Sequence, residues 1–169
     1  DLGMPFNRRP KAIKLDYRVK LTDSPNRIRQ TGFSKVSTVP GRDMPEMVVI
    51  LQQRKENADG SITAKRVGTQ IYKFTQSTNG WVEGKTFDIM YGDITKHPGY
   101  TKRMDLMRGD ATIYARNSKG ENVPVDENGW ADASATPTHA IVKFDSSHGG
   151  AYIGSIGTTL WLDNIKWVY

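Results

Sequence analysis

The chain has 169 residues, no cysteine and a net charge of +6, from 24 lysines and arginines against 18 aspartates and glutamates. This length suits one domain with a full hydrophobic core, and the lack of cysteine excludes thiol catalysis, thiolate metal sites and disulfides. The basic balance invites a nucleic-acid function, but the cations are spread along the chain without a recognition-helix or RNA-binding motif, so we predict no nucleic-acid partner.

Residues 13–21 carry the first strong pattern, with apolar side chains at odd positions and charged ones at even positions. This alternation predicts a strand with one face in the core and one in water, and therefore an antiparallel sheet. Further strands are predicted at 47–53, 68–75, 86–91, 111–116 (a weaker pattern), 139–144 and 158–169. Turns rich in glycine and asparagine separate them, and helical periodicity is lacking. We therefore predict one all-β domain over residues 1–169, an antiparallel β-sandwich (jelly roll) with little or no helix.

Both ends of the chain resemble a known family. The segments GMPF (3–6), RPKA (9–12) and LDYRVK (15–20), with FDSS (144–147) and GTTLWLDNI (157–165), resemble the Bacteroidetes carbohydrate metabolism domain family. The resemblance implies a jelly-roll domain similar to carbohydrate-binding modules, at the C-terminal end of a longer surface lipoprotein. The middle of the chain is compatible but less diagnostic.

The resemblance also implies a setting and partners. We expect a protein that is secreted or held on the outer-membrane surface of a Gram-negative bacterium, with a lipid anchor on an upstream segment. Its partners would be a poly- or oligosaccharide and an upstream immunoglobulin-like domain. No apolar run approaches the ~20 residues of a spanning helix, so we predict no membrane insertion by this domain. The loop 146–157 departs from the family pattern at His148 and Gly150, which leaves its role open.

Sugar recognition needs flat aromatic rings surrounded by polar groups that satisfy the hydroxyls. Trp81 and Trp130 follow Asn-Gly turns, which predicts positions near strand ends, where binding loops gather. Tyr91 and Tyr100 flank a central loop and Arg103 lies just beyond it, a combination suited to a sugar or a uronic acid. These five residues form the predicted carbohydrate site. The alternative is that the tryptophans close the ends of the sandwich and the tyrosines fold back.

The last predicted strand combines large apolar residues with one carboxylate. We expect Trp161 and Trp167 to be core residues of this strand. Asp163 interrupts the apolar run, and the alternation of apolar and polar residues along the strand shifts there, as at a β-bulge. A buried carboxylate must be paired, protonated or bound to a cation, and jelly-roll carbohydrate modules often hold a structural calcium near such an aspartate. Asp163 is thus the candidate calcium ligand, although no cluster of six to eight oxygens is evident. The alternative is a carboxylate that accepts backbone N–H groups at the bulge.

Catalytic patterns are weaker than these binding patterns. A glycosidase needs two carboxylates ~5–9 Å apart; Asp126 and Glu127 are adjacent in a predicted turn and would point in opposite directions. The histidines lack metal-ligand spacing, and the neighbours Ser147 and His148 do not make a triad. We therefore expect a non-catalytic carbohydrate-binding or accessory domain in bacterial surface glycan utilisation. Two alternatives stay open, a structural or adhesive surface module without glycan binding and a jelly-roll glycoside hydrolase.

Overall fold

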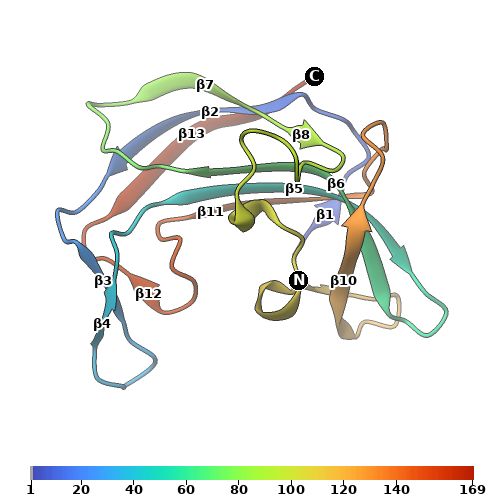
Figure 1. Ribbon diagram of the computed structural model, residues 1–169, viewed down its shortest axis with the longest axis horizontal. Coiled ribbons are helices and arrows are strands. Elements are labelled where there is room, and N and C mark those ends of the chain that lie inside the picture. The colour runs from blue at the N-terminus through green and yellow to red at the C-terminus, as the bar shows by residue number, and fades with distance from the viewer. Residues whose placement is uncertain (1) are drawn as a thin grey trace.

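Residues 2–169 are described by a computed structural model built from three β-sheets (Figure 1). The largest sheet has seven strands in the order β1 (Met4–Pro5), β11 (His139–Asp145), β5 (Glu46–Glu56), β6 (Ile62–Lys73), β10 (Asn122–Trp130) and β9 (Tyr114–Arg116), with β8 (Met90–Tyr91) also paired to β6. A three-stranded sheet has the order β13 (Thr159–Val168), β2 (Ala12–Lys20) and β7 (Val82–Asp88). The other has the order β12 (Ile153–Gly154), β3 (Asn26–Arg29) and β4 (Ser37–Pro40). Two 3-10 turns, η1 (Lys102–Met104) and η2 (Gly109–Ala111), are the only helical elements among the described residues.

The β13–β2–β7 sheet packs on one face of the seven-stranded sheet and encloses the main core. The alternation predicted for residues 13–21 is confirmed, since the odd-numbered side chains are buried in this core. They meet the inward side chains of β5 and β6, which include Met47, Val49, Leu51 and Val67. The predicted all-β sandwich is therefore confirmed.

The seven-stranded sheet is mixed rather than wholly antiparallel, because β10 runs parallel to β6. The chain reaches β10 through the long segment 92–113 and the β9–β10 hairpin, which delivers it to the free edge of β6 in the same direction. The prediction of a turn at Asp126 and Glu127 is wrong, since both lie inside β10. Glu127 is fully buried there, and the bulge that follows it accommodates Asn128 without ending the strand.

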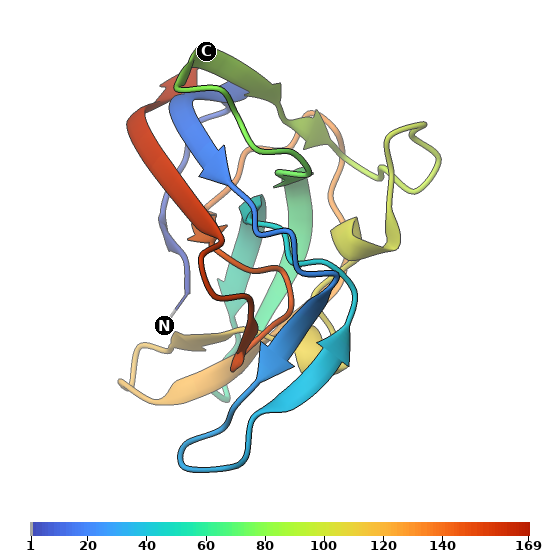
Figure 2. The same ribbon diagram turned by 90° about the vertical axis from the view of Figure 1, so that its left-hand side faces the viewer.

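The described residues form an arch, with the two packed sheets as its roof (Figure 1). The β12–β3–β4 sheet descends from one end of the roof, and β9 and β10 with the far halves of β5 and β6 descend from the other. The side view in Figure 2 shows the β3–β4 hairpin extending away from the sandwich. Segment 92–113 crosses beneath the seven-stranded sheet and contributes Ile94, Met104 and Ile113 to a second hydrophobic cluster on that face.

A buried ion pair holds segment 92–113 against the sheet. Arg66 and Glu127 are both fully buried, and the guanidinium Nε and Nη2 lie 2.6 Å from the two carboxylate oxygens. Arg66 also donates to the carbonyl oxygens of Met104 and Asp105, each at 3.2 Å. The amide of Met107 donates to Glu127 Oε2 at 2.6 Å. Burying two charges is costly unless every group is satisfied, and here the backbone of segment 92–113 and the side chains of Gln52 and Thr69 supply the partners. The position of η1 therefore follows from this pair.

Candidate functional site

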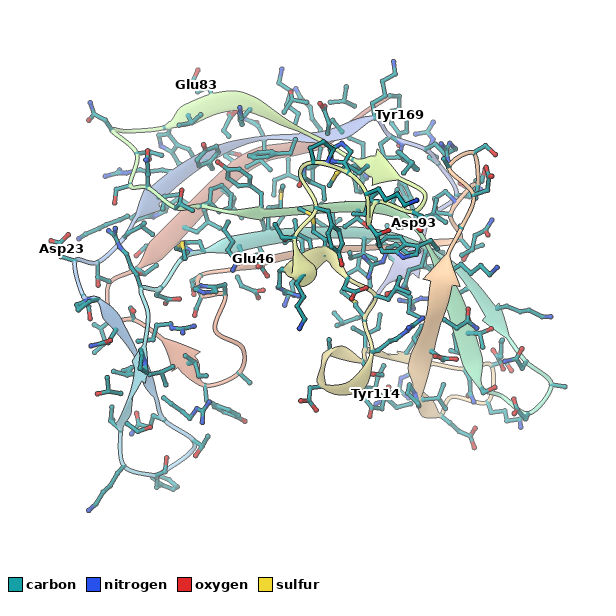
Figure 3. All side chains as sticks on the ribbon, in the orientation of Figure 1. Asp23, Glu46, Glu83, Asp93, Tyr114 and Tyr169 are labelled. Carbon is teal, nitrogen blue, oxygen red and sulfur yellow. The ribbon has the colours of Figure 1, made fainter. Side chains whose placement is uncertain are left out.

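A polar pocket of about 250 Å³ opens on the underside of the seven-stranded sheet. It lies where β5 begins, at Glu46, and where β11 ends, at Lys143 and Asp145. These strands are antiparallel neighbours, and Asp145 is directly paired with Glu46. Figure 3 shows Glu46 beneath the strands, beside the 3-10 turn that carries Arg103. The remaining wall comes from the loop after β11, through Ser147, His148, Gly150 and Ala151.

Two neighbouring ion pairs form the polar wall of this pocket. The buried Glu46 carboxylate accepts from Arg103, with Nε 3.1 Å from both oxygens and Nη2 2.6 Å from Oε1. Lys143 Nζ lies 2.7 Å from Asp145 Oδ2. The Arg103, Lys143 and Asp145 side chains keep 39%, 42% and 31% of their surface exposed, so their remaining donors and acceptors face the pocket. Each cation is matched by a carboxylate, and this wall therefore offers oriented hydrogen-bonding groups with little net charge.

The buried carboxylate of Asp43 holds the loop that closes the pocket. Its Oδ1 accepts from Ser147 Oγ at 2.7 Å and from the amide of Met44 at 3.0 Å. His148 Nδ1 lies 3.2 Å from the Met44 carbonyl oxygen and 3.6 Å from Asp43 Oδ1. Because both neighbours are acceptors, Nδ1 is the nitrogen that carries the proton in the neutral ring. The loop 146–157, whose role the sequence left open, is thus a structured wall of the pocket.

Among the five predicted sugar-binding residues, Arg103 is the one that lines this pocket. Tyr100 and Trp130 are partly buried against the second hydrophobic cluster. Trp130 ends β10 rather than entering a strand, and the Arg66 guanidinium lies 5.5 Å from its ring centroid. The Asn-Gly sequence before it forms part of the strand and not a separate hairpin turn. These two aromatic residues therefore help to cover the second hydrophobic cluster.

Tyr91 and Trp81 lie outside the pocket wall as well. The Tyr91 hydroxyl donates to the Pro10 carbonyl at 2.7 Å, and the Arg9 guanidinium lies 4.2 Å from the ring centroid. Burial raises the pKa of Tyr91, while the charge of Arg9 opposes the rise. Its hydroxyl and one ring face are thus already engaged. Trp81 is 46% exposed just before β7, which belongs to the other sheet of the sandwich. The structure therefore does not gather the five residues on one surface.

The expectation that Asp163 is buried is wrong, because its side chain is exposed at a β-bulge. Its Oδ1 accepts from the amide of Asn164 at 2.7 Å, as the alternative reading of this residue expected. The bulge places Asn164 in the left-handed region, with φ of 51°. Among residues 2–169 no group of three or more histidine, aspartate or glutamate side chains is arranged to hold a metal ion. Calcium at Asp163 stays a prediction.

The tryptophans of the last strand divide between the two faces of their sheet. Trp167 packs against the main core, 5.1 Å from the Phe6 ring, as predicted. Trp161 is 38% exposed on the opposite face, with the Arg18 guanidinium 5.0 Å from its ring centroid. The core prediction is wrong for Trp161, because Leu160 and Leu162 take the inward positions on either side of it.

The pocket residues that sequence reasoning missed are Glu46, Lys143, Asp145, Ser147 and His148. A signal existed, since Glu46 directly precedes the apolar run 47–51 and Asp145 directly follows the strand 139–144. Charged residues at strand ends are common, however, and only the pairing of β5 with β11 makes these two neighbours.

No protein-family model, curated protein or solved structure matches this chain. The resemblance to the Bacteroidetes carbohydrate metabolism domain family therefore stays a prediction. Among the described residues, no helix has the length and apolar character needed to cross a membrane.

Proposed function

We propose that this domain binds an uncharged part of a poly- or oligosaccharide in the polar pocket and leaves it chemically unchanged. The observation that carries the proposal is the pair of neighbouring, charge-compensated ion pairs, Arg103 with Glu46 and Lys143 with Asp145. A sugar hydroxyl both donates and accepts hydrogen bonds, so a wall that alternates donors and acceptors satisfies it. The volume of about 250 Å³ suits a group of the size of one sugar ring.

Charge compensation favours a neutral ligand over an acidic one. Arg103 already binds both oxygens of Glu46, and Lys143 already contacts Asp145. A uronate or sulfate would have to compete with these carboxylates for the cations while lying close to them. A neutral sugar instead bonds to the donors and acceptors that the pairs leave free. The sugar or uronic acid expected for Arg103 is therefore narrowed to a neutral sugar.

A second candidate, glycoside hydrolysis, has one observation in its favour. Glu46 and Asp145 are directly paired across β5 and β11 and line the same pocket. Such paired positions have Cβ atoms about 4.5–5.5 Å apart, comparable to the ~5 Å carboxylate separation of retaining glycosidases. Hydrolysis also needs one protonated carboxyl group to act as general acid. Each carboxylate here is already engaged by a cation, Glu46 by Arg103 and Asp145 by Lys143, so binding without catalysis ranks first.

The test is a glycan array with the purified chain, run with calcium and again with a chelator. Titration of the best saccharide should show about tenfold weaker binding to Asp145→Asn, because one charged hydrogen-bond acceptor is lost. Trp81→Ala is the matched control on the other sheet and should bind as the wild type does. Loss of binding in Trp81→Ala alone would show that the site lies on the β13–β2–β7 sheet instead. Release of reducing sugar that Asp145→Asn abolishes would establish the hydrolase instead.

The cellular setting belongs to the same proposal and rests on the sequence resemblance. It comprises a bacterial surface location, an upstream lipid anchor and an upstream immunoglobulin-like domain. Loss of binding under chelator would support a calcium ion at Asp163. An array that stays silent in both conditions would support the structural or adhesive module.

A further inference from the structure

An apolar hollow of about 160 Å³ adjoins the polar pocket on the same underside of the sheet. Arg103 and Lys143 line both spaces, so the two share a boundary. The other lining residues of the hollow are all apolar: Leu2, Val48, Met107, Ala111, Ile113 and Ile141. The concave face thus changes from polar to apolar across one pair of cationic side chains.

The strands themselves produce this change. Side chains two residues apart share a face of a strand and are separated by about 6.6 Å. Along β11 the face reads Asp145, Lys143, Ile141, and along the paired β5 it reads Glu46, Val48. The step from ion pairs to aliphatic side chains therefore covers roughly the width of a sugar ring. A ligand in the polar pocket would reach the hollow with a substituent.

We infer that the saccharide bound here carries a methyl group beside its hydroxyls, as in a 6-deoxy sugar or an N-acetylated sugar, and that this methyl group occupies the apolar hollow. The inference rests on the proposed function. Water in a space lined mainly by aliphatic side chains finds few hydrogen-bond partners, so a methyl group that displaces it gains affinity. A hydroxyl at the same place would lose its own hydrogen bonds to water, and is disfavoured.

Matched sugar pairs that differ only at this substituent test the inference. We would titrate isotopically labelled protein by amide NMR with L-fucose and L-galactose, and separately with N-acetylglucosamine and glucose. The methyl-bearing member of at least one pair should bind about tenfold more tightly. The first pair reports a 6-deoxy sugar and the second an N-acetyl group, so the two arms separate the two sources of the methyl group.

A variant that fills the hollow locates the preference. Ala111 is exposed and lines the hollow, so Ala111→Leu adds volume there without overpacking the core. This variant should lose the preference for the methyl-bearing sugar. Ala58→Leu, a change at another exposed alanine, in the turn between β5 and β6, should keep it. Equal binding of both members of both pairs would overturn the inference and leave the proposed function standing. Failure of every sugar to bind would overturn both.

Discussion

Glu127 is the residue whose loss should destabilise the fold most clearly, because it neutralises a buried arginine. Glu127→Gln keeps the shape of the side chain but leaves the fully buried Arg66 guanidinium without its counter-charge. We expect the free energy of unfolding to fall by about 3–5 kcal/mol, measured by urea denaturation. Asp145→Asn removes a partner of Lys143 at a partly exposed site and should cost less than about 1 kcal/mol. Equal costs for the two variants would contradict the structural role of the buried pair.

His139 makes stability depend on pH at the residue scale. Partial burial of the ring and the nearby charge of Arg54 lower the pKa of His139. The unfolded chain therefore binds a proton near the ordinary value of about 6.5, while the folded protein does not. The contribution of His139 to the free energy of unfolding should be fully present above that pH and decline as the pH falls toward the lowered pKa. The total loss should be less than about 1 kcal/mol, because the ring is partly solvated. Urea titrations should show this slope in the wild type and in His97→Gln, and a smaller slope in His139→Gln.

At the scale of elements, Asp16 joins two irregular strands to β2. Its Oδ1 accepts from the amide of Gly84 in β7 at 2.5 Å, and its Oδ2 accepts from Asn164 Nδ2 in β13 at 2.6 Å. Both strands shift register at these points, and Gly84 adopts a positive φ of 59° that favours glycine. One carboxylate thus replaces ladder hydrogen bonds that the bulges remove.

Asp16→Ala should therefore lower Tm and speed amide hydrogen exchange in β7. The hydrogen bonds from Asn164 and Gly84 lower the pKa of Asp16. Its contribution is present above the unfolded pKa of about 3.9 and is lost as the pH falls through the lower folded value, so wild type and variant should converge in strong acid. Asp163→Ala, opposite Asp16 in the register, removes only a local bond to Asn164 and should change Tm less. A calcium-dependent rise in Tm that Asp163→Ala abolishes would show that this residue binds the cation.

Strands specified by a local sequence pattern could be predicted, whereas strands that depend on contacts between distant parts of the chain could not. The strands with a long apolar pattern, β2, β5, β11 and β13, were all predicted within a few residues, because an alternating or continuous apolar pattern is a local property of the sequence. The short polar strands β3, β4 and β12 were missed, since they are ordered mainly by pairing with one another. β10 was missed because Asn128 and Gly129 indicate a turn, while Glu127 is held in the strand by Arg66.

The candidate site depends on the same long-range pairing. Arg103 was predicted from its place beyond an aromatic loop, and it does line the pocket. Its partner Glu46 lies 57 residues away in the chain, and no local pattern connects the two. The aromatic residues were favoured because sugar sites need flat rings. Trp130 and Tyr100 also suit a core position, and in the structure both are partly buried against the second hydrophobic cluster. Composition can nominate such residues, yet only tertiary packing decides which face solvent.

At the scale of the whole molecule, a net charge of +6 coexists with a pocket whose charges are paired. These two features predict opposite responses to salt. Binding driven by the basic surface weakens steeply with ionic strength, since added ions screen exposed charges and compete for the polyanion. Binding in the pocket by hydrogen bonds to a neutral sugar should hold its affinity within about twofold from about 50 mM to about 500 mM salt.

Heparin or duplex DNA is the comparison ligand, and any binding of either should fall by more than about tenfold over that range. A saccharide whose affinity fell as steeply as that of the polyanion would show that the basic surface, not the paired wall of Arg103 and Lys143, carries recognition.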